Sequence, residues 1–165
     1  MAFQRKTRPL DAPPLTPDEA LAKLEYFCAY RDRCSQEVLD RIRELRLPKE
    51  LGEQLFDVLK ADRFFDDTRF TEMYVRSKFR SNQWGKVRIR MELKMRNLEP
   101  ELIENAIDML DQEEYEATVK SLLKKKLKQW EGDPLARQKA AASVIRAGFE
   151  MDLVFKLVDI LVREG

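Results

Sequence analysis

The amino-acid sequence matches itself when it is shifted by 51 residues, and the match holds without a gap over most of each unit. Apolar residues then fall on apolar residues in five sets: Val38, Ile89 and Ala140; Ile42, Leu93 and Val144; Leu47, Leu98 and Phe149; Leu51, Leu102 and Leu153; Leu59, Leu110 and Leu161. Helical periodicity alone produces some matches of this kind. Turn residues add support, because Pro48 and Pro100 each open a third helix and Gly148 ends the helix before it.

This register predicts three tandem units of about three helices each. A unit of this size cannot bury its apolar face alone, so it must pack on its neighbours. We expect the repeats to cover residues 16–62, 63–111 and 112–165. Residues 1–15 carry Arg5, Lys6 and Arg8 among prolines and few apolar residues, which predicts a flexible basic tail.

The composition favours an all-α fold. Hydrophobic residues make up 44% of the 165 residues, enough for a core, while 37% are charged and only five are glycine. None of the seven prolines falls in the middle of a predicted helix.

Local signals place several helix ends. Thr16, Pro17 and Glu19 form a capping box with proline in the first turn, so the first helix should begin there and run to about Tyr30. Ser35 is the expected N-cap of the second helix, and Pro48 should start the third. Further signals bound the last three helices: about Glu113 to Trp130 with Gly132 as the stop, a cap at Asp133-Pro134, and Asp152 to about Arg163.

The segment from Val87 to Met95 is ambiguous when it is read alone. Val87, Ile89, Met91, Leu93 and Met95 alternate with charged residues, which is typical of a strand. The equivalent segments of the other two repeats favour a helix, so we predict a helix here as well. Such a helix has a second apolar face made of Val87, Met91 and Met95. We expect that face to pack on a neighbouring unit, with contact to a partner as the alternative.

Charge is arranged in blocks, although the net charge of the whole chain is only +1. Residues 69–96 hold nine Lys or Arg against two acids, and residues 97–117 hold eight acids and no base. Such blocks create local fields that select partners. The candidate partner-binding residues are the following: Arg76, Lys78, Arg80, Lys86, Arg88, Arg90, Lys94, Arg96, Lys124, Lys125 and Lys126.

Two kinds of partner fit this basic segment, and a purely structural role is the third interpretation. Its Tyr74, Phe79 and Trp84 are interleaved with the bases, as in surfaces that hold phosphates and stack on nucleic-acid bases. An acidic protein surface fits the same charges equally well. Aromatic residues at helical spacing are also common in protein cores, and basic faces are often only solvated, so these patterns alone leave the choice open.

Catalysis is not indicated. The chain has no histidine, the usual general base, and no glycine-rich phosphate loop. Asp66 and Asp67 stand before a predicted helix, where acids are common caps. Cys28 and Cys34 lack metal-ligand spacing and further ligands, so we expect reduced thiols in a cytoplasmic protein. The expected catalytic, cofactor-binding and metal-binding residues are none, and neither a signal peptide nor a membrane span is predicted.

Four segments in order resemble the RecX family of recombinase regulators. They are Tyr26 to Val38, Phe64 to Phe70, Lys78 to Ile89 and Arg146 to Asp152, and the resemblance extends from about Thr16 to the C-terminus. It implies three tandem three-helix repeats that form an elongated, curved solenoid. Two features depart from the family pattern: Ala147 stands where a basic residue is expected, and the acidic block at residues 97–117 can change which surface meets the partner.

The resemblance also implies a function. RecX proteins bind the RecA filament on single-stranded DNA and restrain its ATPase, strand-exchange and coprotease activities, in recombination, DNA repair and the SOS response. They are regulators rather than enzymes. We expect the same of this chain, as a monomer whose partner is the RecA filament, with single-stranded DNA as a further candidate partner. The alternative is direct binding of single-stranded or duplex DNA.

Overall fold

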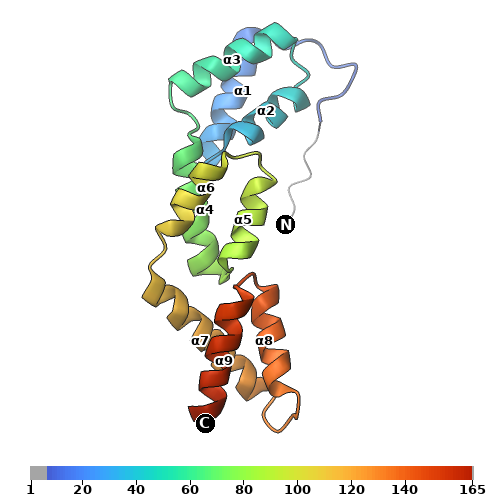
Figure 1. The fold of residues 1–165 in the computed structure, drawn as a ribbon. Helices are drawn as coiled ribbons and strands as arrows, with labels where there is room; N and C mark the ends of the chain where they lie inside the picture. Colours follow the sequence, from blue (N-terminus) through green and yellow to red (C-terminus); the bar gives the residue numbers. More distant parts are fainter. Residues whose placement is uncertain (1–6, 165) are drawn as a thin grey trace. The chain divides into compact units, whose positions relative to one another are not determined.

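The computed structural model describes residues 7–164, which form nine helices and no strand, so the all-α prediction is confirmed (Figure 1). The helices are α1 Pro17–Tyr30, α2 Ser35–Glu44, α3 Lys49–Ala61, α4 Asp67–Asn82, α5 Lys86–Lys94, α6 Pro100–Asp108, α7 Gln112–Gln129, α8 Ala136–Arg146 and α9 Met151–Glu164. They belong to two compact units. The first unit runs to residue 70 and includes 96–98, and the second unit comprises residues 71–95 and everything from residue 99 onward.

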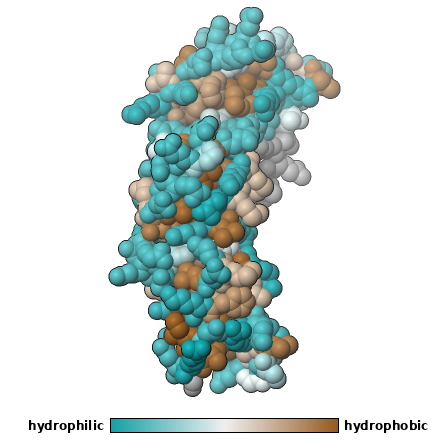
Figure 2. Space-filling view, viewed as in Figure 1, coloured by the Kyte–Doolittle hydropathy of each residue, from teal (hydrophilic) through white to brown (hydrophobic). Residues whose placement is uncertain are grey.

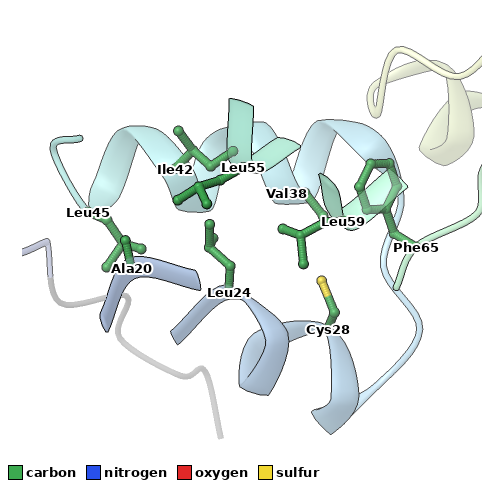
Figure 3. Close-up of a cluster of buried hydrophobic side chains, with 9 residues drawn as sticks. All are labelled: Ala20, Leu24, Cys28, Val38, Ile42, Leu45, Leu55, Leu59 and Phe65. Carbon is green, nitrogen blue, oxygen red and sulfur yellow. The ribbon is translucent and has the colours of Figure 1, made fainter. Parts of the chain in front are cut away.

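The first unit is a three-helix core of α1, α2 and α3, which all pack on one another. Figure 3 shows the apolar side chains that these helices direct inward, among them Leu24, Val38 and Leu59, all three fully buried. The predicted capping box at the start of α1 is confirmed, because Thr16 and Glu19 exchange both hydrogen bonds, at 3.2 and 2.9 Å. Arg8 donates its backbone N–H to the carbonyl of Glu44.

In the second unit, α7, α8 and α9 pack together and α5 packs on α6. Three aromatic rings form the centre of its core: Tyr115 of α7 lies 5.4 Å from Phe79 of α4 and 5.3 Å from Phe149, measured between ring centroids. All three side chains are at most 1% exposed. Aromatic pairs at this spacing contribute beyond the area they bury.

The 51-residue register reappears in the structure. The equivalent helices α2, α5 and α8 begin at residues 35, 86 and 136, and α3, α6 and α9 begin at residues 49, 100 and 151. Val38, Ile89 and Ala140 are all fully buried. A left-handed residue lies two or three positions after the end of each of these second helices, with φ of 54° at Arg46, 53° at Asn97 and 98° at Gly148. The repeat boundaries at residues 62 and 111 stay a prediction.

The structure corrects several helix ends. Leu135, rather than Asp133 or Pro134, is the N-cap of α8, and α9 begins at Met151, one residue before the predicted Asp152. Ser35 is the first residue of α2 rather than its cap, and it donates its backbone N–H and its hydroxyl to Asp67, both at 2.6 Å. Pro48 is the N-cap of α3, so that helix begins one residue later than predicted. Part of the predicted basic tail, including Arg5 and Lys6, lies outside the described residues.

Candidate functional site

The candidate partner-binding residues lie on three helices and one loop. Arg76, Lys78 and Arg80 belong to α4, and Lys86, Arg88, Arg90 and Lys94 belong to α5, which is a helix as predicted. The three lysines at 124–126 belong to α7. These ten residues are all part of the second unit, whereas Arg96 follows α5 and belongs to the first unit. The candidates are therefore not one surface of one unit.

Acids of the block that follows the basic segment neutralise two of these bases. Arg80 forms a bidentate ion pair with Glu114, with N–O distances of 3.2 and 3.1 Å. Arg90 pairs with Glu104 in the same way, at 2.6 and 2.9 Å. The planar guanidinium matches a carboxylate in this geometry. A basic residue held this way offers little net charge to a partner.

Three further bases lie over aromatic rings. The Arg88 guanidinium carbon is 3.9 Å from the centroid of the Trp84 ring, and the Lys78 amine is 4.8 Å from the same centroid. The Lys86 amine lies 4.6 Å from the centroid of Tyr115. These cation–π contacts hold the three side chains in place, and unlike an ion pair they bring no acid that would neutralise the positive charge.

Five candidates are exposed and form no ion pair with another residue of the described chain: Arg76, Arg88, Lys94, Lys124 and Lys125. We call them the exposed cations of the second unit. Lys126 is half-buried, and its amine donates to Gln129 at 3.2 Å. The positive charge available to a partner is therefore carried mainly by these five side chains.

The beginning of α5 is fastened to the end of α8 by backbone contacts. The Gly85 N–H donates to the carbonyl of Ala147 and the Val87 N–H donates to the carbonyl of Gly148, both at 2.9 Å. A Cβ at Gly85 would collide with the Gly148 and Phe149 backbone, and a Cβ at Gly148 would collide with Arg88. Both positions require glycine because two backbones meet here. The contact fixes where Arg88 leaves the helix.

Tyr115 also holds the start of α5 in place, through its hydroxyl group. Its hydroxyl accepts the backbone N–H of Lys86 at 2.9 Å and donates to the carboxylate of Glu150 at 2.5 Å. It thereby satisfies one N–H at a helix start that lacks a side-chain cap of its own. Burial, reinforced by the bond to Glu150, raises the pKa of Tyr115 well above its ordinary value, so the hydroxyl keeps its proton.

The pair between Arg90 and Glu104 makes part of the stability of the second unit depend on pH. The hydrogen bonds from Arg90 lower the pKa of Glu104 below its ordinary value of 4.5. A lowered folded-state pKa contributes stability above the unfolded-state pKa, and this contribution is lost as the pH falls through the folded-state value. Glu104→Gln should therefore cost about 0.5 kcal/mol at pH 6, a small value because both side chains are partly exposed, and less at pH 3.

Urea unfolding at the two pH values, followed by tryptophan fluorescence, measures this difference. Trp84 and Trp130 are the only tryptophans of the sequence and both belong to the second unit. Glu101→Gln is the matched control, since it removes an exposed carboxylate of the same helix that forms no ion pair in the described part of the chain. An equal cost of Glu104→Gln at both pH values would contradict the predicted role of the pair.

The acids and cysteines that were considered as catalytic or metal-binding residues have structural roles instead. Asp66 accepts the backbone N–H of Arg69 at 2.9 Å, so it caps α4, and Asp67 binds the start of α2 as described above. Burial raises the pKa of the thiols of Cys28 and Cys34 to about 11, and both cysteines are free. Among residues 7–164, no group of three or more His, Cys, Asp or Glu side chains is placed to hold a metal ion. No helix within that range is long and apolar enough to cross a membrane.

Sequence reasoning missed the residues that organise this surface. Glu104 and Glu114 decide which arginines stay available, and Tyr115 and Gly85 hold α5 in place. One signal pointed to the acids, because an acidic block directly after a basic one can neutralise it across neighbouring helices. Nothing comparable identified Tyr115, whose role depends on contacts with residues about 30 positions away in either direction.

Several known RecX proteins are similar to this chain. The sequence pattern described as "RecX, second three-helix domain" matches residues 66–107. "Regulatory protein RecX" of Oceanobacillus iheyensis is 26% identical over 135 residues, which are 81% of this chain and 50% of that protein. Its namesake in Thermobifida fusca is 24% identical over 157 residues, 90% of this chain and 85% of the relative. This chain spans about half the length of the first relatives, including those of Geobacillus.

Solved structures show the same fold. The crystal structure of RecX from Lactobacillus salivarius matches with a TM-score of 0.77 at 18% identity, over 90% of this chain and 95% of that one. A second crystal structure, of "regulatory protein RecX", matches with a TM-score of 0.74 at 20% identity, over 87% and 73% of the two chains. Together with the sequence matches, these structures confirm the resemblance to the RecX family.

Proposed function

We propose that this chain, similar in sequence and fold to regulatory proteins of the RecX family, binds a RecA filament on single-stranded DNA. Through that binding it restrains the recombinase, ATPase and coprotease activities of the filament. The observation that carries the proposal is the set of exposed cations of the second unit, which keep their charge after acids have neutralised Arg80 and Arg90. The chain acts by binding, without catalytic residues of its own.

Several weak contacts on one unit favour an assembled polymer over its free subunits. Arg76 lies on α4, Arg88 and Lys94 on α5, and Lys124 and Lys125 on α7. Each exposed charge contributes little by itself. Neighbouring subunits of a filament present their acidic groups together, so the contacts add up within one binding event. Binding of this kind slows subunit rearrangement and thereby restrains the activities that depend on it.

Direct binding to DNA is the competing function, and the aromatic residues give it little support. Phe79 is 1% exposed and packs against Tyr115, so no base can stack on it. The Trp84 ring already has Arg88 and Lys78 over it, and Tyr74 is half-buried with Lys78 nearby. Base stacking needs open aromatic faces. The surface therefore fits a protein partner better than bare single-stranded DNA.

Removing three exposed cations should weaken binding to the filament. We expect the variant Arg76→Ala, Arg88→Ala, Lys94→Ala to bind RecA-coated single-stranded DNA about ten-fold more weakly, since three exposed charges at about 0.5 kcal/mol each amount to one factor of ten. Alanine keeps the Cβ of Arg88 next to Gly148, so the fold should persist. Fluorescence anisotropy of labelled DNA, with and without the recombinase coat and across salt concentrations, measures the effect.

A charge-neutral variant serves as the control. Arg80→Ala together with Glu114→Ala removes an exposed arginine and its ion-pair partner at once, so filament binding should stay close to that of the unchanged protein. Inhibition of filament ATPase activity should follow the same order as binding. Unchanged filament binding by the three-cation variant would refute the proposal. Steeply salt-dependent affinity for bare DNA, with no gain from the recombinase, would favour direct DNA binding instead.

A further inference from the structure

Three apolar side chains form an exposed stripe along α5. Val87 is 41% exposed, Met91 61% and Met95, the residue at its C-terminal end, 67%. Residues four apart lie about 40° from each other around a helix, so the three share one side. Ile89 and Leu93 point the other way and are fully buried. Within the second unit most of this face stays exposed, so the expected packing on a neighbouring repeat is not seen there.

Cations lie on both sides of the stripe. From the helical repeat, Arg88 falls beside it at one edge and Lys94 at the other. Both are exposed and form no ion pair within the described part of the chain. Arg90 comes next on the Lys94 side, but Glu104 neutralises it, and Glu92 lies beyond Arg88. The face of α5 is therefore apolar along its middle and positive along both edges.

The fold does not require this stripe. The equivalent positions of the first repeat are Gln36, Asp40 and Glu44, and those of the third repeat are Gln138, Ala142 and Arg146. Helices α2 and α8 form in the same register with these mostly polar residues. Figure 2 shows that the visible surface of the molecule is largely hydrophilic, with separate apolar patches. Only α5 of the three exposes apolar side chains at all three positions, which indicates contact with a partner.

We propose that the α5 face docks an amphipathic helical segment of a partner protein, with apolar residues along one side and acidic residues flanking them. The apolar side of such a segment covers Val87, Met91 and Met95, and its carboxylates reach Arg88 and Lys94. Methionine suits this role because its flexible side chain adapts to the shape it meets. The inference deepens the proposed function and rests on it in one respect: the segment belongs to the filament protein.

Charge and polarity together select an acidic protein segment over other polyanions. A nucleic acid presents hydrated phosphates, which pair with Arg88 and Lys94 but leave the apolar middle of the face uncovered. A protein helix offers both apolar and acidic side chains, and it repeats them at the same helical spacing as the residues of α5. Apolar burial then contributes affinity, while the flanking charges fix orientation and exclude basic partners.

Methionine methyl groups allow a direct test. Besides Met1, the sequence has five methionines, and all are exposed, between 51% for Met73 and 67% for Met95. The full chain, labelled with 13C at the methionine methyl groups, is titrated with a designed helical peptide of leucines at positions i, i+4 and i+7 flanked by glutamates. We expect the signals of Met91 and Met95 to shift and those of Met73, Met109 and Met151 to stay in place.

Matched reagents define the outcomes. A peptide with lysine in place of each glutamate should bind the unchanged chain at least about ten-fold more weakly. The acidic peptide should lose at least the same factor against the double variant Met91→Gln, Met95→Gln and against the single variant Lys94→Glu. Met109→Gln is the control, because Met109 is as exposed as Met91 and lies at the end of α6. Equal affinity for both peptides, shifts spread over all five methionines, or no shift would overturn the proposal. So would shifts of Met91 and Met95 produced by single-stranded DNA or anionic lipid vesicles instead.

The filament assay separates this inference from the proposed function. If the designed peptide fails to bind while the unchanged chain still binds RecA-coated DNA, the docking face is wrong and the function stands. If the peptide binds as expected while the filament does not, the face is correct and its partner is a different acidic protein, so the proposed function fails. Circular dichroism of each variant confirms that α5 and the other helices remain formed.

Discussion

Gly85→Ala is expected to lower the free energy of unfolding of the second unit by about 3 kcal/mol or more. Gly85 precedes α5 with φ of −80°, which alanine adopts without strain. The whole cost is therefore steric: the added Cβ would collide with the backbone of Gly148 and Phe149. Backbone cannot swing aside as a flexible side chain does, so α5 must move away from the end of α8. That movement also weakens the two backbone hydrogen bonds from Gly85 and Val87.

Gly132→Ala is the matched control for this prediction. Gly132 has φ of 84° and nothing lies within 4 Å of the position a Cβ would take. Alanine there meets only the cost of a left-handed backbone, about 1 kcal/mol. Urea unfolding followed by tryptophan fluorescence reports on the second unit for both variants. A cost for Gly85→Ala at or below that of Gly132→Ala would contradict the close approach of α5 and α8.

Tyr115→Ala should cost about 3 to 5 kcal/mol, the range for removing a large aromatic side chain from a core. Tyr115 is the largest fully buried side chain of the described residues and lies between the rings of Phe79 and Phe149. Its loss opens a cavity among helices α4 and α7 and the start of α9. It also leaves the Lys86 N–H without its acceptor. The same unfolding experiment measures the cost.

Tyr115→Phe separates the ring from the hydroxyl. The ring contacts persist in this variant, while the partly buried Lys86 N–H and the Glu150 carboxylate lose their partner, at a cost of about 1 to 3 kcal/mol. Tyr115→Phe should therefore be intermediate between the unchanged protein and Tyr115→Ala. If Tyr115→Phe costs as much as Tyr115→Ala, the ring contributes nothing and its central place in the core is wrong. If it costs nothing, the hydroxyl is not holding the start of α5.

The secondary structure could largely be predicted because its signals are local. The capping box at Thr16 and the breaker at Gly132 act within a few residues of the helix ends they set. The register of 51 residues resolved the strand-like pattern of Val87 to Met95, which a window of that segment alone would have assigned wrongly. The errors at Ser35 and Pro48 are of one residue, and Ser35 was misassigned because its hydroxyl bonds to distant Asp67 rather than to its own helix.

The candidate site could be predicted only as a set of charges. The sequence determined by itself that the chain is all-helical, that its helices repeat, and that one central segment is strongly basic, because periodicity, capping and composition are properties of neighbouring residues. Tertiary packing, in contrast, sets three features of the site: Glu114 and Glu104 pair with Arg80 and Arg90, Phe79 is buried, and Met91 is exposed. Those outcomes depend on which helix faces meet, and side chains 14 to 34 positions apart are brought together by packing rather than by local pattern.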